Sequence, residues 1–345
     1  GNVNTKSDLC AVYSAWELVF VETADPNDDP QAGQYNFILY GGWGRALTDV
    51  PADRVVTYGR LPNGMKYAIR ANSTPKGTAS IRLYFDVGSI AESERERGLA
   101  HFIEHMAFNG TTHVPEGEMM KILERQGLAF GPDTNAMTSF ESTIYMLELP
   151  KVDEQRLETA FFLLREVASE VKFDPEAVDR ERGVILSEKR SRENFQLRRI
   201  VKNLEFHMPQ ARFANRLPIG TEEELKSATA ARLTDLYRRY YRPENATLVI
   251  VGDVDPKQVE AKLRAKFADW TGKGQAGAKP DKGRVDFARA ADFASFTDPA
   301  IETSAMITVE RPWDDPADTL AQRRLVTIRQ IGLALLSRRM DKIAN

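Results

Sequence analysis

The run Gly98–Phe108, whose sequence is GLAHFIEHMAF, decides how the rest of the chain is interpreted. Residues in a helix advance by about 100° each, so a helix over this run would project His101, Glu104 and His105 from one side within about two turns. The apolar residues of the run follow the i, i+3, i+4, i+7 spacing and form a stripe nearly opposite: they are Leu99, Phe102, Ile103 and Met106. The pattern predicts a helix with one face in a core and the other presenting two imidazoles and a carboxylate.

The HxxEH spacing is suited to a zinc peptidase centre, because two neutral imidazoles can bind the metal while a carboxylate handles the protons of water. The alternative is a solvated helix face or a hydrogen-bonded structural cluster. The chain has only four histidines, so a chance pairing in this pattern is improbable and we favour the metal site. The other two, His113 and His207, lack comparable neighbours, and we expect each to be a surface or core residue.

A catalytic zinc ion takes three protein ligands and keeps one position open, so two histidines do not complete a site. The stretch Phe173–Glu188, FDPEAVDRERGVILSE, contains the best candidates for the third. Asp174 before Pro175 is typical of a helix start. On that helix Glu181 and Glu188 are seven residues apart and align within roughly 20° of each other.

The flank that carries this glutamate pair is partly apolar, because Val178 and Ile185 run alongside it, and we expect that flank to be buried. Charged residues at helical spacing usually form a solvated face, and we expect Arg192 and Glu193 beyond the pair to do so. The residues alone leave both a functional and a solvated pair open.

Six stretches, two of which overlap, resemble the pitrilysin/insulinase family of zinc peptidases, whose motif reverses HExxH. They are HFIEHMAFNGT (101–111), DPEAVDRERGVILSEKR (174–190), RLPNGMKYAI (60–69), FDVGSIAESERERGLAHF (85–102), FGPDTNAMTSFESTIYMLELP (130–150) and YYRPENATLVIVGDVDP (240–256). The chain looks most like the bacterial, periplasmic-type members. The resemblance implies an α+β fold with a mostly antiparallel sheet packed by helices, followed by the start of a second, similar domain.

The resemblance also implies a role for each candidate residue. His101, His105 and Glu188 match the zinc ligands of the family, and Glu104 matches the general base. Glu181 matches the glutamate that supports the site from outside the ligand set. The predicted cofactor is therefore one zinc ion.

The stretch Asn135, Ala136, Met137 and Thr138 resembles the exposed edge strand on which the family binds peptides by strand addition. The alternative is an ordinary strand of a hairpin, because an edge is not visible in a sequence. Met137 stands where the family presents a larger apolar residue, so the resemblance implies a different pocket preference. Extended binding favours peptides or unfolded polypeptides as substrates.

The composition is that of a soluble enzyme. The net charge of −3 indicates neither a nucleic-acid-binding nor an anionic-membrane-binding protein, and no apolar run approaches membrane-spanning length. The single cysteine, Cys10, excludes an internal disulfide and a thiolate zinc site. The first residues lack a basic region and a cleavage site, so we do not interpret them as a signal peptide; a periplasmic location is implied by the resemblance alone.

We predict four segments: an unassigned stretch 1–45, a zinc peptidase domain 46–271, a linker 272–290 and an incomplete second domain 291–345. Glycine and lysine dominate 271–283, as in a linker. The elements expected from periodicity are a hairpin through 62–64, strands near 80–87 and 247–251, and helices at 115–127, 230–241 and from 256. Two strands and two long helices are expected after the helix at 115–127, and the second of these helices carries Glu181 and Glu188. Beyond the linker we expect a strand at 304–310 and a helix at 318–343.

The function predicted from these observations is that of a zinc-dependent endopeptidase with a glutamate general base. One alternative is a non-catalytic relative that acts as a scaffold or processing-complex subunit, and another is an unrelated zinc hydrolase of small molecules, which would need the edge strand to be covered. In the family a further half contributes an arginine and a tyrosine facing the zinc. No counterpart to it occurs in this sequence, so the resemblance implies a missing C-terminal half or a partner chain, and we expect weak cleavage by this chain alone.

Overall fold

The computed structural model describes residues 18–20, 37–39, 55–129, 131, 133–301, 304, 306–310, 312 and 319–344. The chain forms two compact units: Val55–Met306, and a second that combines residues 1–54 with 307–345. The stretch 1–45, left unassigned by the sequence, lies outside the described residues except for strands β1 (Leu18–Phe20) and β2 (Phe37–Leu39), which pair antiparallel.

The unit Val55–Met306 is built on a six-stranded sheet with the order β3-β4-β8-β5-β7-β6. Its strands are β3 (Val56–Arg60), β4 (Lys66–Ala71), β5 (Ala79–Phe85), β6 (Thr134–Thr138), β7 (Thr143–Leu149) and β8 (Ala246–Gly252). Only β4 and β8 are parallel, and the other neighbouring strands are antiparallel. The mostly antiparallel sheet predicted from the resemblance is confirmed, as is the hairpin between β3 and β4.

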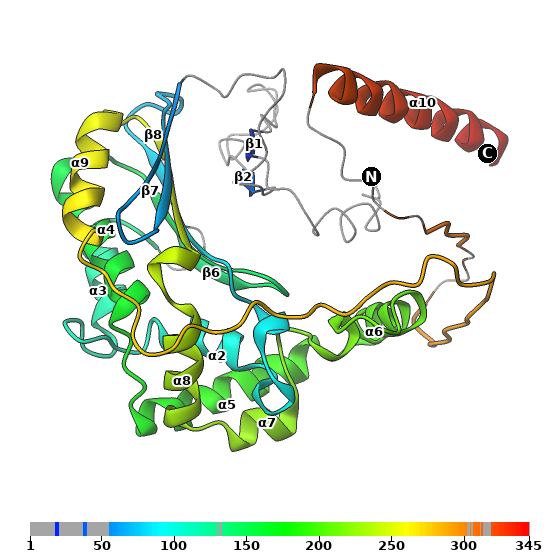
Figure 1. Cartoon of the computed structure of the whole chain (residues 1–345), viewed down its shortest axis with the longest axis horizontal. Coiled ribbons are helices and arrows are strands. Elements are labelled where there is room, and N and C mark those ends of the chain that lie inside the picture. Colours follow the sequence, from blue (N-terminus) through cyan, green and yellow to red (C-terminus); the bar gives the residue numbers. More distant parts are fainter. Residues whose placement is uncertain are drawn as a thin grey trace. The chain divides into compact units, whose positions relative to one another are not determined.

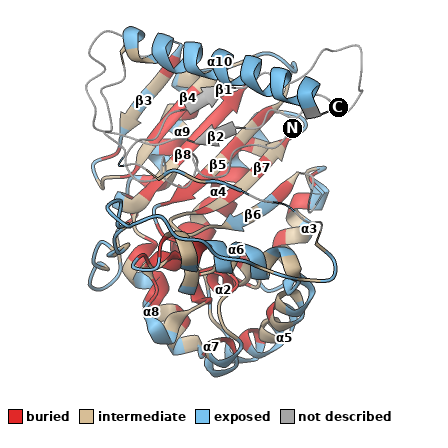
Figure 2. Ribbon diagram, turned by 90° about the vertical axis from the view of Figure 1, so that its right-hand side faces the viewer, coloured by how far each residue is buried: buried red, intermediate tan, exposed pale blue. Residues whose placement is uncertain are grey.

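The burial of the strands follows from their place in the sheet. Along β7 the side chains alternate between buried and half-buried, the period-two pattern of a strand with one face in the core. Strand β8 lies between β4 and β5, and six of its seven residues are buried (Figure 2). Residues 246–252 therefore complete the same core that residues 56–149 begin.

This unit contains eight described helices, six of which begin after a short polar side chain that caps them and two of which begin after a glycine. The eight are α2 (Leu99–Met106), α3 (Glu118–Arg125), α4 (Glu154–Ser169), α5 (Pro175–Arg192), α6 (Phe195–His207), α7 (Glu222–Ser227), α8 (Ala230–Tyr240) and α9 (Pro256–Phe267). Asp174 accepts the N–H groups of Glu176 and Ala177, so the predicted start of α5 is confirmed. Helices α6 and α7 were not anticipated, although Asn194 and Thr221 cap them in the same way.

Helices α4 and α9 lie against one face of the sheet, α4 on β7 and α9 on β4, and they also contact each other (Figure 1). Helix α2 contacts β6 and β7 and packs against α5 and α8. Its predicted apolar stripe is confirmed, because no residue of the stripe is more than 1% exposed. On the opposite side of α2, His101 and Glu104 are only 5% and 8% exposed, and His105 is half-buried.

The start of α2 is held by a buried carboxylate rather than by its own cap residue. Gly98 is the cap and has no side chain, and its φ of +98° is a conformation that favours glycine. The Glu92 carboxylate accepts the N–H groups of Gly98 at 3.0 Å and of Ala100 at 2.8 Å. Burial raises the pKa of Glu92 to about 8, although these two hydrogen bonds and the charge of Arg216 act in the opposite direction.

The predicted linker runs along the first unit. Within 271–283 there is no helix or strand, apart from an isolated bridge between Gly283 and Ala211. The Gly277 N–H donates to the Arg239 carbonyl, and the Lys282 carbonyl accepts the N–H of Arg212.

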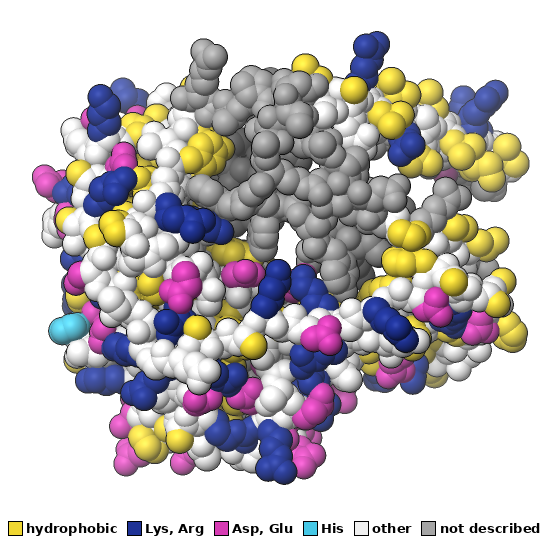
Figure 3. Space-filling view, in the orientation of Figure 1, with side chains coloured by type: hydrophobic (Ala, Val, Ile, Leu, Met, Phe, Trp, Pro, Cys, Tyr) yellow, Lys and Arg dark blue, Asp and Glu magenta, His cyan; other side chains and the backbone are white. Residues whose placement is uncertain are grey.

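On the face shown in Figure 3, acidic and basic side chains are interspersed over the unit Val55–Met306. The domain boundaries stay predictions.

One predicted element beyond the linker is wrong and one is confirmed. The described residues of 304–310 form no strand, and the apolar side chains Met306, Ile307 and Val309 are 68%, 96% and 73% exposed. Period-two hydrophobicity produces a strand only where a partner strand accepts its main-chain hydrogen bonds, and no described strand pairs with this stretch. The predicted helix is α10 (Leu320–Ala344). Among the described helices, none is both long and apolar enough to cross a membrane.

Candidate metal centre

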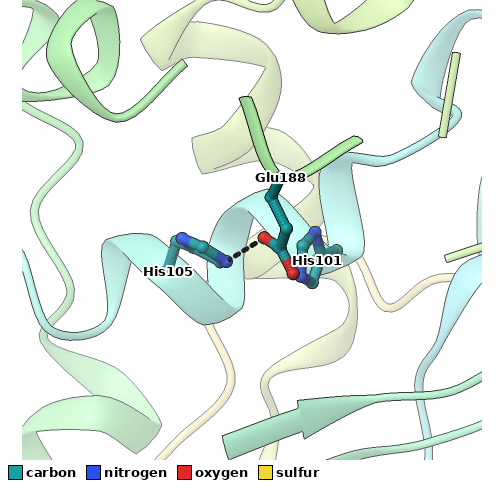
Figure 4. Close-up of side chains that lie close together, drawn as sticks. All are labelled: His101, His105 and Glu188. Atoms are coloured by element: carbon teal, nitrogen blue, oxygen red, sulfur yellow. Dashed lines mark ion pairs between the residues drawn. The ribbon is translucent and has the colours of Figure 1, made fainter. Parts of the chain in front are cut away.

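Helices α2 and α5 bring His101, His105 and Glu188 into one cluster. One ligand atom from each lies within 4.8 Å of the others. The Glu188 Oε2 atom is 3.3 Å from His105 Nε2 and 3.7 Å from His101 Nε2, and Figure 4 shows the Glu188 side chain extending toward both imidazoles. Within the described part of the chain, this is the only group of three or more His, Cys, Asp or Glu side chains that could share one ion.

The donor set fits a zinc ion, which binds imidazole nitrogen and carboxylate oxygen in catalytic sites. Burial lowers the pKa of His101 to about 3, and the charges of His105 and Arg192 act in the same direction. His101 is therefore neutral near pH 7 and has a lone pair to donate.

The imidazole of His105 is hydrogen-bonded to Glu181, the first of the two glutamates on α5. The Glu181 Oε1 atom is 2.7 Å from His105 Nδ1, and its Oε2 atom accepts the side-chain N–H of Asn109 at 3.0 Å. Burial alone would lower the pKa of His105, but the hydrogen bond and charge of Glu181, with Glu104 and Glu188, raise it. The seven-residue spacing thus places Glu181 at Nδ1 and Glu188 at Nε2 of one ring, which fixes the orientation of that ring.

The third polar residue of the motif, Glu104, faces β6. Its Oε2 atom accepts a hydrogen bond from the Thr138 hydroxyl at 2.5 Å. Burial raises the pKa of Glu104, and the hydrogen bond from Thr138 opposes that shift. Glu104 is thus a buried carboxylate next to the cluster, with a higher proton affinity than an exposed glutamate.

The segment that resembles a peptide-binding strand is β6, and it lies at the edge of the six-stranded sheet (Figure 2). Among the described strands it pairs only with β7. Asn135 and Met137 are exposed, while Ala136 and Thr138 on the alternate face are half-buried. The edge position is compatible with strand addition, because an internal strand could not accept a further strand, but β6 also forms a hairpin with β7, so peptide binding here stays a prediction.

Two contacts of the cluster were not anticipated from the sequence. Arg192, expected to be solvated, forms an ion pair with the Oε1 atom of Glu188, although its side chain is 58% exposed. The i, i+4 spacing of Glu188 and Arg192 could have indicated this pair. The hydrogen bond from Thr138 to Glu104 had no local signal, because the two residues are 34 positions apart.

His113 is not part of the cluster. Its Nδ1 atom is 2.8 Å from the Oε1 atom of Glu166, a carboxylate that is 3% exposed and also accepts the hydroxyl of Thr111. The His113 side chain is 62% exposed, so of the two expected places, surface or core, His113 lies at the surface.

The fold and the cluster define the class of this chain. Residues 67–215, which include every residue of the cluster, match the family described as insulinase, peptidase family M16. Residues 227–321 match the peptidase M16 inactive domain. The chain belongs to the insulinase family of peptidases.

Individual relatives agree with this assignment. A probable zinc protease PqqL of Haemophilus influenzae is 39% identical over 220 residues, which are 64% of this chain and 24% of that protein. The crystal structure of the periplasmic protease PqqL from Escherichia coli is similar with a TM-score of 0.64 and 33% identity, over 67% of this chain and 26% of that one. The structure of the first half of that protease gives a TM-score of 0.66 over 69% of this chain and 51% of that one.

The chain spans about a quarter of the length of the curated relatives it matches first. The boundary between the two family matches does not coincide with a boundary in the folded structure. The second match begins at residue 227, before β8, yet β8 lies between β4 and β5 of the first match. Similarity to the inactive domain therefore begins inside the core that carries the histidine cluster.

Proposed function

We propose that this chain carries the catalytic centre of a zinc-dependent endopeptidase that hydrolyses peptides or unfolded polypeptides. The observation that carries the proposal is the convergence of two imidazole Nε2 atoms and one carboxylate oxygen beside the buried carboxylate of Glu104. Relatives named as probable zinc proteases support the same metal and reaction class.

In this proposal His101, His105 and Glu188 hold one zinc ion. When bound, zinc supplies a Lewis acid that polarises a carbonyl group and lowers the pKa of water toward neutrality. Glu181 keeps the His105 ring in the orientation that presents Nε2 to the metal, because it holds the opposite nitrogen.

Glu104 acts as the general base. It accepts a proton from the attacking water and transfers that proton to the leaving amine of the cleaved peptide bond. Burial raises its pKa, which moves the proton affinity of the carboxylate toward the value needed near neutral pH.

The substrate is proposed to bind as an extended strand along β6, at Asn135, Ala136, Met137 and Thr138. Strand addition takes its affinity from main-chain hydrogen bonds, so the peptide must be unfolded where it binds. A hydrolase of small molecules would not need this edge, and no described strand covers it. The exposed side chain of Met137 would contact the substrate from the outer face.

Substitution of Glu104 by glutamine tests the proposal. Glutamine keeps the shape and removes the basicity, so the variant should keep about one zinc ion per chain and lose at least about a hundredfold in cleavage of an unstructured quenched-fluorescent peptide. Glu176→Gln, an exposed glutamate near the start of α5, is the matched control and should cleave like the wild type. Loss of zinc together with activity would make Glu104 a ligand, and unchanged activity would leave the scaffold alternative.

Two further proposals concern the cellular compartment of the protein and the parts that complete its active site. The E. coli relative is titled a periplasmic protease, and we propose the same compartment for the whole protein. We also propose that an opposing part, in the same chain or a partner, closes over the substrate and supplies a charged or hydroxyl group to the oxyanion. Residues 1–345 alone should then cleave at least about two orders of magnitude more slowly than the protein with that part added.

A further inference from the structure

The main chain of β6 has a defined register, which shows where its polar groups point. At one end the Glu148 N–H donates to the Asp133 carbonyl, and at the other the Ser139 N–H donates to the Ser142 carbonyl, both at 2.7 Å. Hydrogen-bonded and non-hydrogen-bonded pairs alternate along an antiparallel ladder. With the pairing of Asn135 opposite Met146, the main-chain groups of residues 135 and 137 point toward β7.

The main-chain groups of Ala136 and Thr138 therefore point away from β7, toward the free edge of the sheet. Those of Thr134 point the same way but are already used. The Thr134 N–H donates to the Ala129 carbonyl at 3.0 Å, and the Thr134 carbonyl accepts the N–H of Gly131 at 2.8 Å. The Ala136 N–H is also used, because it donates to the Oδ1 atom of Asn135 at 2.8 Å. Of the described β6 main-chain groups that point outward, the C=O of Ala136 and both the N–H and the C=O of Thr138 are left for an added strand.

The side chain of Thr138 points the other way from the exposed face, into the domain. Its hydroxyl donates to Glu104 Oε2, and this is the only hydrogen bond of the Glu104 carboxylate among the described residues. Glu104 Oε1 is left to accept a proton. One residue thus contacts the proposed base through its side chain and presents its main chain to the edge where the proposed substrate adds.

We propose that Thr138 is a positioning residue that fixes Glu104 relative to a peptide bound on β6. This inference rests on the proposed function. The hydroxyl holds one carboxylate oxygen, so the free oxygen of Glu104 keeps a constant position with respect to the main chain of residues 136 and 138. A bound peptide is in register with that same main chain, so the base and the peptide bond to be cleaved are aligned by one strand.

Thr138→Val removes the hydroxyl, keeps the volume and suits a strand, so the domain should fold and bind zinc. The freed carboxylate of Glu104 then samples other orientations, and kcat should fall about tenfold, since small misplacements of a catalytic group cost about that much or more. KM should change by less than about twofold, because the main-chain groups of the edge are intact. Thr138→Ser keeps the hydroxyl and should restore kcat to near the wild-type value.

The matched control is Thr134→Val, on the same strand and the same face. The Thr134 hydroxyl is buried without a hydrogen-bond partner among the described residues, and its outward main-chain groups are already bonded. This variant should leave kcat and KM unchanged. The experiment measures kcat and KM on an unstructured quenched-fluorescent peptide and zinc content by elemental analysis for all four proteins, with Glu104→Gln alongside.

A low kcat for Thr138→Val, with full zinc, unchanged KM and rescue by serine, supports the inference. Equal kcat for Thr138→Val and wild type overturns it, as does failure of serine to rescue or a change confined to KM. If Glu104→Gln is inactive while Thr138→Val is unimpaired, only the role of Thr138 fails. If Glu104→Gln cleaves like the wild type, the proposed function fails and this inference fails with it.

Discussion

Helix α2 is contacted by α5 and by strand β6, and these two elements present different chemical groups to it. On one side α5 presents Glu181 and Glu188, two charged side chains that reach the imidazoles of His101 and His105. On the other side β6 presents a hydroxyl group and a free main-chain edge. In the proposed function the α5 side binds a cation, whereas the β6 side aligns a peptide chain. The first can be inferred from helical spacing, but the second depends on the order of strands in the sheet.

The largest expected effect concerns the α5 side. His105→Ala removes one of three proposed ligands and the partner of Glu181, so zinc content should fall from about one ion per chain to near zero. Because an ion bound only by the folded state stabilises that state, the thermal midpoint should fall as well, and the loss of unfolding free energy should approach about 4 kcal/mol when free zinc is about a thousandfold above Kd. Elemental analysis and thermal unfolding in matched buffer check both.

His113→Ala is the control for this substitution, since His113 binds Glu166 outside the cluster. It should keep full zinc content. If His105→Ala protein also keeps full zinc, the proposed ligand set is wrong. Treatment of the wild type with a chelator should reproduce the lower thermal midpoint of His105→Ala, and it should have little effect on the variant itself.

The two sides also differ in how far the sequence predicts them. The i, i+4 spacing of the histidines and the i, i+7 spacing of Glu181 and Glu188 depend only on helix geometry, and both pairs converge in the structure. The hydrogen bond of Thr138 depends on where β6 lies in the sheet, which no local pattern encodes. The strand expected at 304–310 fails for the same reason, because a strand needs a partner that its own sequence does not specify.

The next largest effect tests whether Glu181 acts on the metal only through His105. Glu181→Gln keeps a hydrogen-bond acceptor but removes the charge that holds the ring, so the Kd for zinc should rise by about 10- to 100-fold. Activity should return at saturating zinc, since no proposed ligand or base is lost. Titration with a competing fluorescent chelator measures the Kd. A variant that binds zinc normally would show that the ring is held by packing alone.

A third prediction concerns Glu92, which accepts two backbone N–H groups at the start of α2 and lies on neither α5 nor β6. Burial raises the pKa of Glu92 to about 8 from its ordinary value near 4.5, so the folded state favours the protonated form. The stabilising contribution of this group is complete below about pH 4.5 and is lost as the pH rises through 8, because the unfolded state then binds fewer protons than the folded state. Glu92→Gln does not titrate and should show a flatter dependence.

Denaturant unfolding of the wild type and Glu92→Gln between pH 5 and 8 measures this effect, with chelator present so that zinc does not contribute. The wild type should exceed the variant by about 1 kcal/mol or more at pH 5, the scale of one hydrogen bond, and the difference should shrink as the pH rises. A difference that grows with pH would mean that an ionised Glu92 caps α2 through its two backbone N–H groups.

The smallest expected effect on the Kd for zinc comes from substituting Arg192. This substitution tests whether Glu188 is oriented by its ion pair with Arg192 or by the helix backbone of α5. The Arg192 guanidinium binds the Glu188 oxygen that faces away from the histidines, but its side chain is 58% exposed, so water and salt screen the interaction. Arg192→Gln should therefore change the Kd for zinc by less than about threefold, well below the effect of Glu181→Gln. Arg192→Lys keeps the charge without the planar fork and should fall between wild type and glutamine. If Arg192→Gln weakens zinc binding as much as Glu181→Gln does, Glu188 is oriented mainly by this ion pair, and the helix backbone of α5 is not sufficient to aim its oxygen at the two imidazoles.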